Sequence, residues 1–300
     1  LHALLPVAVL IALYTFLNSP IVALSDSAAM HMLGDQRDHY GRVRLGGTVG
    51  WALAAPLAGL LVQANGLHMA FWGFAGFMAL ALLVSQRLSF VSPAGARPPD
   101  HARAGAQILL RNRRWLLFLA MAFVSGCGLA VINSYLFVYL QELNAPASVM
   151  GLALTLGTLS ELPVLFYADR LLKRLGAFGL LTLGMGMTGV RLLLFAAVSA
   201  PAGVLLFQIL NGLTFPAVWV AGVSFAYKHA PPGLSATAQG LFSATVFGFG
   251  AAAGGLLGGL LLGAAGGRAM YATMGLLVLA SLALLAPLGR RLSPAQAELP

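Results

Sequence analysis

Nine apolar stretches, each close to the length that a helix needs to cross a membrane, dominate this sequence of 300 residues. They run over residues 3–30, 45–63, 68–86, 115–139, 147–167, 177–198, 202–227, 236–264 and 268–289. A membrane-spanning helix needs about 20 apolar residues to cross roughly 30 Å of hydrocarbon. A transmembrane barrel would instead show segments of about ten residues that alternate between apolar and polar, and these stretches are apolar throughout. The sequence therefore predicts an all-α membrane protein.

Charged residues are too scarce for a soluble protein. They make up 8% of the chain, against about 25% in soluble domains, which excludes a cytosolic enzyme, a secreted binding module and a disordered chain. The single cysteine, Cys127, cannot form an internal disulfide, and the six histidines have no zinc-binding spacing. We therefore expect no metal and no cofactor.

The basic residues divide unequally between the two sides of the predicted spans. Counted on alternate connections, fifteen lie on one side and Arg268 stands alone on the other. Because basic loops stay in the cytoplasm, the C-terminus is expected inside, and the net charge of +9 reports orientation and not nucleic-acid binding. The fifteen are Arg37, Arg42, Arg44, Arg87, Arg97, Arg103, Arg111, Arg113, Arg114, Arg170, Lys173, Arg174, Lys228, Arg290 and Arg291.

One long polar stretch, residues 87–114, separates the spans into two groups. Its Pro, Gly and Arg content is typical of a linker between domains, and we expect it on the cytoplasmic side. Three spans precede it in residues 1–86 and six follow in residues 115–300. Because this division is unequal and the chain opens on Leu1 within an apolar run, we expect that an N-terminal portion is missing.

Six spans after a basic cytoplasmic linker resemble the C-terminal half of a major facilitator superfamily transporter, in which two six-span bundles form the fold. The three spans before the linker would then resemble spans four to six of twelve. The run YADRLLKRLG at residues 167–176 resembles the Asp-Arg-basic loop motif of that family between spans eight and nine, with Asp169 and Arg170 in the motif positions. An ordinary charged loop is the alternative interpretation.

A second run, DHYGRVRLGGTVGWAL at residues 38–53, carries most of the specificity of the resemblance. Its first part is similar to the phenylpropionate permease branch of the superfamily, and its Gly-Arg-x-Arg and Val-Gly-Trp-Ala-Leu elements are similar to lactose permease. The resemblance extends over essentially the whole chain at low identity. It implies a major facilitator fold with about nine of twelve transmembrane helices present, in a monomer of a bacterial inner membrane that binds a small molecule and a proton.

Ionisable residues within the apolar stretches mark the candidate site, because a charge in hydrocarbon is costly and is kept for function or for a partner. Three qualify: Asp26, Glu161 and Arg191. Arg44 enters the next span from the same cytoplasmic side as Asp26, so these two can meet. Trp51 follows Arg44 by two helical turns and lies on the same helix face, with Thr48 between them.

A carboxylate and a guanidinium beside an aromatic plane suit a polar ring, which can form hydrogen bonds at its edge and stack on its face. By the resemblance, Asp26, Arg44 and Trp51 match the carboxylate, arginine and tryptophan that bind galactoside in lactose permease. The alternative is that Arg44 only anchors the helix at the membrane surface and that Trp51 is an ordinary packing aromatic.

Glu161 and Arg191 match, by the same resemblance, a glutamate and an arginine of the substrate and proton-coupling site. A structural ion pair between two helices is the alternative. The sequence departs from lactose permease at Asn211 and Thr214, which stand where that protein has the histidine and glutamate of its proton site. Glu161 or Asp26 would then have to carry the proton. Asn211 is expected to contact substrate, and the alternative is that its amide only joins helices, as such side chains often do in lipid.

These features predict a secondary transporter that works by alternating access, with a sugar, a nucleoside or an aromatic acid as substrate and with proton-coupled symport. An uncoupled facilitator or an efflux antiporter of the same fold is the alternative. A membrane enzyme would need a nucleophile, a metal cluster or an acid pair near an interface, and the sequence offers none. A receptor or scaffold would not need three ionisable residues at membrane depth.

Overall fold

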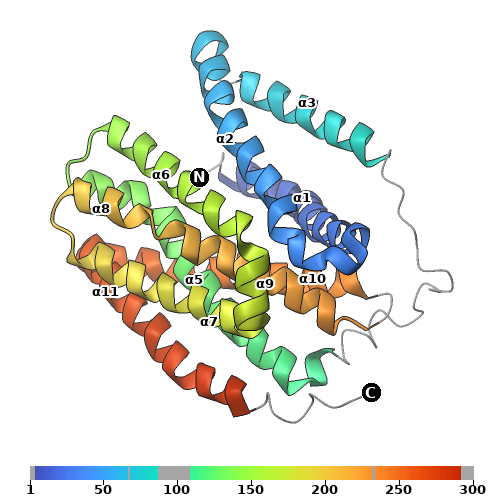
Figure 1. The fold of residues 1–300 in the computed structure, drawn as a ribbon. Coiled ribbons are helices and arrows are strands. Elements are labelled where there is room, and N and C mark those ends of the chain that lie inside the picture. Colours follow the sequence, from blue (N-terminus) through green and yellow to red (C-terminus); the bar gives the residue numbers. More distant parts are fainter. Residues whose placement is uncertain (1–3, 67, 87–108, 232–233, 292–300) are drawn as a thin grey trace.

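The computed structural model describes residues 4–66, 68–86, 109–231 and 234–291, and every regular element within these ranges is helical (Figure 1). The predicted all-α class is confirmed. Six helices of the described ranges are long and apolar enough to cross a membrane, judged by length and composition. Most of the predicted linker, residues 87–108, lies outside the described residues.

The first group of helices consists of α1 (Leu4–Leu33), α2 (Tyr40–Asn65) and α3 (His68–Ser85). A short 3-10 helix, η1 (Gly34–His39), joins α1 to α2. Within this group α3 packs on α2, whereas α2 also packs on α6 and α1 packs on α10 (Figure 1). The group is therefore joined to the rest of the molecule through α1, α2 and η1, which packs on α7.

The second group forms a bundle around α5. Its elements are α5 (Arg113–Glu142), α6 (Ala147–Phe166), α7 (Ala168–Ala197), α8 (Pro201–Gln208), α9 (Asn211–His229), α10 (Ser235–Ser243), the π-helix η2 (Ala244–Gly250) and α11 (Ala251–Arg291). Helix α5 packs on α7, α9, α11 and η2. Positive φ angles at Gly176 (65°) and Gly266 (78°) interrupt α7 and α11, close to predicted span boundaries at 177 and between 264 and 268.

The predicted span 202–227 is broken into α8 and α9, and a side chain from α6 explains the break. In a continuous helix the N–H of Gly212 would bond to the carbonyl of Gln208. Here Gly212 donates to Oγ of Ser160 at 3.0 Å instead, while that hydroxyl lies 2.7 Å from the Gly157 carbonyl and 3.4 Å from the Gln208 carbonyl. A side chain inserted into the backbone ladder is a known cause of helix bends.

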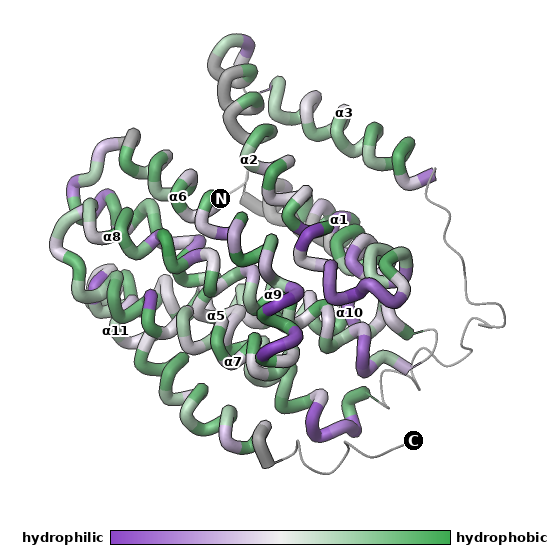
Figure 2. The backbone as a smooth tube through the Cα atoms, viewed as in Figure 1, coloured by the Kyte–Doolittle hydropathy of each residue, from purple (hydrophilic) through white to green (hydrophobic). Residues whose placement is uncertain are grey.

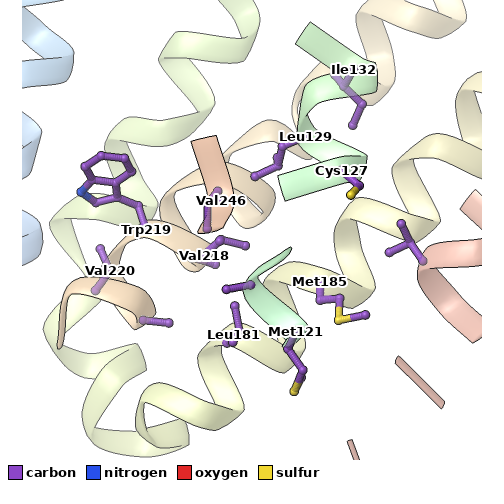
Figure 3. Close-up of a cluster of buried hydrophobic side chains, with 14 of the residues drawn as sticks. Met121, Cys127, Leu129, Ile132, Leu181, Met185, Val218, Trp219, Val220 and Val246 are labelled. Carbon is purple, nitrogen blue, oxygen red and sulfur yellow. The ribbon is translucent and has the colours of Figure 1, made fainter. Parts of the chain in front are cut away.

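Apolar side chains fill the bundle and also cover its outside. Figure 3 shows Met121 and Cys127 of α5 close to Met185 of α7 and Val246 of η2 within the buried cluster. A Cβ added at Gly254 would lie 2.7 Å from Cα of Cys127, so α11 packs directly on the α5 backbone. The small residue at this position thus allows the two helices to approach closely.

Polar residues gather at one end of the molecule, around η1 and the beginnings of α5 and α7, while apolar residues cover most of the helix surfaces (Figure 2). Large apolar side chains on those surfaces are well exposed, among them Phe71 (73%), Leu260 (71%) and Leu284 (72%). Such side chains lose nothing by facing lipid, which is as apolar as they are. The outer surface is therefore suited to a hydrocarbon environment.

Candidate functional site

A cavity of about 490 Å³ lies between α2 of the first group and helices α5, α6 and α9 of the second. This volume is within the range of sites that hold small organic molecules. The lining residues are Arg44, Gly47, Thr48, Trp51, Asn133, Thr158, Glu161, Asn211 and Phe215. Four of the predicted site residues line it, and the prediction that Arg44, Thr48 and Trp51 share one face of a helix is confirmed.

Among the described residues that line the cavity, one side chain is basic and one is acidic. The guanidinium of Arg44 lies 4.6 Å from the centroid of the Trp219 ring. Glu161, which is partly buried, accepts a hydrogen bond of 2.8 Å from Nδ2 of Asn211 and one of 3.5 Å from Oγ1 of Thr48. Because the two formal charges balance, the lining suits a neutral solute that can both donate and accept hydrogen bonds.

Arg191 lies behind this wall, 2% exposed. Its guanidinium donates to Oδ1 of Asn211 at 2.7 Å, to Oγ1 of Thr214 at 3.2 Å and to Oε1 of Gln208. A guanidinium can only donate, so the Asn211 amide must turn its oxygen to Arg191 and its nitrogen to Glu161. Among the described residues, Arg191 and Glu161 are thus joined through Asn211 and not by a direct ion pair.

Asp26 is 6% exposed and has a different partner from the predicted one. It accepts a hydrogen bond of 2.6 Å from the hydroxyl of Tyr40, which in turn accepts one of 2.8 Å from Nε1 of Trp219. In the part of the chain that the structure describes, Asp26 forms no ion pair with Arg44 and is not a lining residue of the cavity. Asp26 is therefore connected to the lining residue Arg44 through Tyr40 and Trp219.

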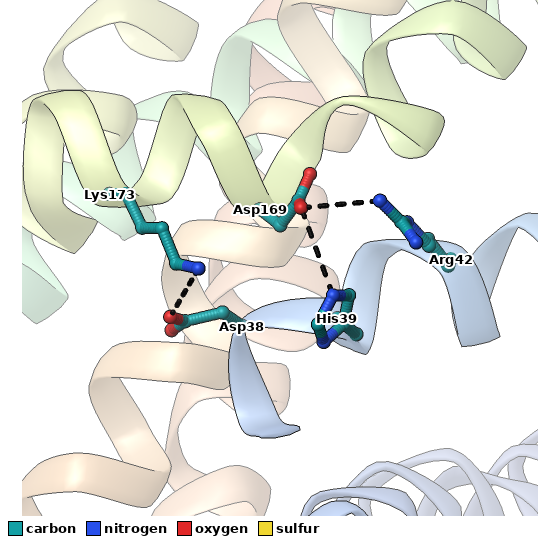
Figure 4. Close-up of polar contacts among 5 residues, drawn as sticks. All are labelled: Asp38, His39, Arg42, Asp169 and Lys173. Atoms are coloured by element: carbon teal, nitrogen blue, oxygen red, sulfur yellow. Dashed lines mark hydrogen bonds and ion pairs between the residues drawn. The ribbon is translucent and has the colours of Figure 1, made fainter. Parts of the chain in front are cut away.

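The loop-motif residue Asp169 joins α7 to the first group of helices (Figure 4). Its carboxylate, 7% exposed, lies 3.4 Å from Nη2 of Arg42 and 4.0 Å from Nε2 of His39. Beside it, Lys173 lies 3.5 Å from Asp38. Residues 38–42 and 169–173, which belong to the two runs that carried the family resemblance, therefore contact each other.

Arg170, the second motif residue, does not take part in this cluster. Arg170 is exposed, and its guanidinium lies 5.0 Å from the centroid of the Tyr167 ring. The contact between α2 and the α6–α7 turn also depends on Gly41, because a Cβ added there would overlap Cβ of Ala168. The glycine of the Tyr-Gly-Arg run thus allows the close approach of two backbones.

Comparison with known proteins identifies the fold and the family. The family model described as the MFS_1 like family matches residues 2–273. The chain belongs to the MFS_1 like family. It therefore belongs to the major facilitator superfamily, and the predicted fold is confirmed. The structure is similar to a crystal structure of a variant of the nucleoside transporter NupG, with a TM-score of 0.60, 19% identity, and coverage of 91% of this chain and 73% of that one.

Two curated relatives of this MFS_1 like chain have names that mention a substrate. The maltose permease of Geobacillus stearothermophilus is 32% identical over 85% of this chain and 64% of its own length. The putative nucleoside transporter YegT of Escherichia coli is 27% identical over 84% of this chain and 62% of its own length. The chain thus spans less than two thirds of the length of these relatives.

Two residues of the site in this MFS_1 like chain, Tyr40 and Trp219, were not predicted from the sequence, and they form the link between Asp26 and Arg44. Gln208 and Thr214 are polar residues that the sequence offers, but their contact with Arg191 was not predicted. Gln208 and Thr214 carry a signal in the sequence, since they are polar residues within an apolar stretch and lie one helical turn or less from Asn211. Tyr40 and Trp219 carry no such signal, since aromatic residues are common in membrane helices.

Proposed function

We propose that this chain forms part of a secondary transporter for a neutral ring compound rich in hydroxyl groups, a sugar or a nucleoside, which it carries by alternating access. The observation that carries the proposal is the cavity between the two groups of helices, in which Arg44 and Glu161 face a common space beside Trp51 and Phe215. Hydroxyl groups can accept from Arg44 and donate to Glu161, while the aromatic rings pack on the face of the sugar or base.

An aromatic acid is the less favoured of the substrates suggested by the sequence. Its carboxylate could pair with Arg44, but it would enter a cavity that already contains the carboxylate of Glu161. Juxtaposed like charges cost several kcal/mol. The names of the maltose permease and of the nucleoside transporter YegT agree with a neutral solute.

For energy coupling we propose proton symport in which Glu161 carries the proton and Arg191 senses it through Asn211. The two hydrogen bonds of the Asn211 amide, 2.7 Å to Arg191 and 2.8 Å to Glu161, support this assignment. An uncoupled facilitator is the second candidate, because Asn211 and Thr214 stand where the resemblance to lactose permease places a histidine and a glutamate. We also propose that the chain belongs to the lactose or phenylpropionate permease branch of the superfamily, because of the run at residues 38–53.

We also propose that the protein works as a monomer in the inner membrane of a bacterium. Residues 1–86 would form three spans, residues 87–114 a linker, and residues 115–300 a bundle of six spans.

The deciding experiment is uptake into proteoliposomes that contain the full-length protein, with radiolabelled maltose, uridine and phenylpropionate, with and without a pH gradient. Uptake of maltose or uridine supports the proposal. Uptake of phenylpropionate alone contradicts the substrate class, and uptake of none contradicts the function.

A further inference from the structure

Trp219 occupies a junction between three helices. It is 5% exposed, and its Nε1–H donates to the hydroxyl of Tyr40, which is 1% exposed, at 2.8 Å. An indole N–H can only donate, so the Tyr40 hydroxyl accepts from Trp219 and must give its own single proton elsewhere. The acceptor is Oδ1 of Asp26, at 2.6 Å. The direction of both hydrogen bonds is thus fixed by chemistry.

Arg44 lies over the face of the Trp219 ring, with its guanidinium 4.6 Å from the ring centroid. Two further rings pack on Trp219, with centroids at 5.7 Å for Phe215 and 5.0 Å for Phe247. A cation over an indole face is held by the electron-rich ring, and indole is the best of the aromatic side chains for this interaction. The position of Arg44 in the cavity therefore depends on how the Trp219 plane is fixed.

We propose that Asp26, Tyr40 and Trp219 form a hydrogen-bonded support that sets the position of Arg44 in the cavity. Asp26 is then a positioning residue that acts through Tyr40 and Trp219, and it does not touch the substrate. The inference rests on the proposed function, since it takes Arg44 to be a substrate contact. It replaces the direct Asp26–Arg44 pair that the sequence suggests.

The support joins the two groups of helices. Asp26 lies on α1, Tyr40 and Arg44 lie on α2, and Trp219 lies on α9. Any movement that separates α2 from α9 breaks the bond between Tyr40 and Trp219 and removes the ring from beneath Arg44. Arg44 is thus held for substrate only while these helices are packed together, which links affinity to the conformation of the transporter.

A first experiment tests the support without any transport measurement. The full-length protein is labelled with 5-fluorotryptophan in nanodiscs, and the fluorine resonance of Trp219 is identified by its loss in Trp219→Phe. We expect Tyr40→Phe, Asp26→Leu and Arg44→Gln each to shift this resonance. Tyr139→Phe, which removes another buried tyrosine hydroxyl, one that donates to the Phe195 carbonyl at 2.8 Å, and Asp38→Leu are the matched controls and should leave it in place.

An unchanged Trp219 resonance in Tyr40→Phe or in Asp26→Leu, which removes the acceptor of the Tyr40 hydroxyl, overturns the proposal. The proposal is also overturned if the two control variants shift the resonance as far as these variants do, because the shift would then report a general change in packing.

A second experiment measures the effect on substrate, as initial uptake of labelled maltose and uridine into proteoliposomes. Tyr40→Phe and Asp26→Leu should each raise KM about ten-fold, with the maximal rate altered by less than about two-fold. Adding Tyr40→Phe to Arg44→Gln should raise KM no further, because both changes act on one contact.

A direct substrate contact by Asp26 predicts a different pattern, in which Asp26→Leu raises KM and Tyr40→Phe leaves it unchanged, and that result overturns the proposal. If the unaltered protein takes up neither solute, the proposed function is wrong, and the fluorine spectra still decide whether the support of Arg44 exists.

Discussion

The side-chain nitrogen of Asn211 donates a hydrogen bond of 2.8 Å to Oε1 of Glu161, and this bond joins α9 to α6 at the wall of the cavity. The amide cannot turn over, because its oxygen is engaged by the guanidinium of Arg191. A neutral side chain thus stands between an acid and a base. Changes to the acid or to the amide should therefore alter transport in different ways.

Replacement of Glu161 by glutamine should separate binding from coupling. In Glu161→Gln the side chain can still accept from Asn211 but can no longer carry a proton, so we expect loss of gradient-driven accumulation with substrate exchange retained. Counterflow and pH-driven uptake in the same proteoliposomes measure the two activities. Glu142→Gln is the control, since Glu142 accepts from the backbone N–H of Gly267 away from the cavity. Accumulation that persists in Glu161→Gln would place coupling on another group or ion.

Replacement of Asn211 by an acid should reduce substrate exchange, and removal of the acid at Glu161 should then restore it. Asn211→Asp puts a carboxylate at hydrogen-bond distance from that of Glu161, which costs several kcal/mol, so exchange should fall about ten-fold or more. The double variant Asn211→Asp with Glu161→Gln again has a single acid in this cluster, now beside Arg191, and should recover exchange.

The matched control for this pair is Asn133→Asp, which adds a carboxylate to the same cavity away from the link with Arg191. It should reduce exchange less than Asn211→Asp does, and Glu161→Gln should not rescue it. A double variant that is as inactive as Asn211→Asp alone would argue against the role of the Asn211 amide.

The close approach at Gly41 should be sensitive to a single methyl group. A Cβ there would overlap Cβ of Ala168 and lie 2.7 Å from the Leu165 carbonyl oxygen, so Gly41→Ala forces α2 away from the α6–α7 turn. Overpacking of this kind costs about 1–3 kcal/mol, which thermal unfolding in detergent would detect. Gly46→Ala, on the same helix with open space around the added Cβ, should be neutral or slightly stabilising. Equal unfolding temperatures for the two variants would show that the close approach at Gly41 contributes nothing to stability.

The orientation in the membrane can be tested by cysteine labelling of intact cells. Single cysteines at Asn144 and Arg268 should react with a membrane-impermeant reagent, and cysteines at Lys173 and Lys228 should react only after the cells are opened, because basic loops stay in the cytoplasm. Cys127 is buried and should add little background. The reverse pattern would overturn the orientation.

The sequence was sufficient for the features that depend on one helix at a time. Apolar length located the helices, and helical spacing placed Arg44, Thr48 and Trp51 on one face. Features that depend on contacts between distant helices were missed. Tyr40 and Trp219 are 179 positions apart, and no spacing rule connects them. The break between α8 and α9 was missed for the same reason, since its cause is a hydroxyl on α6.

That hydroxyl, on Ser160, has a consequence for how the span formed by α8 and α9 can move. A backbone N–H or carbonyl without a partner is expensive in hydrocarbon, so a helix there resists bending wherever bending would break its own bonds. At Gly212 the neighbouring helix has already taken over the N–H. The span can therefore flex at this point at little cost. Ser160→Ala, a change on α6, would remove the acceptor of the Gly212 N–H and so alter the bend of the neighbouring span.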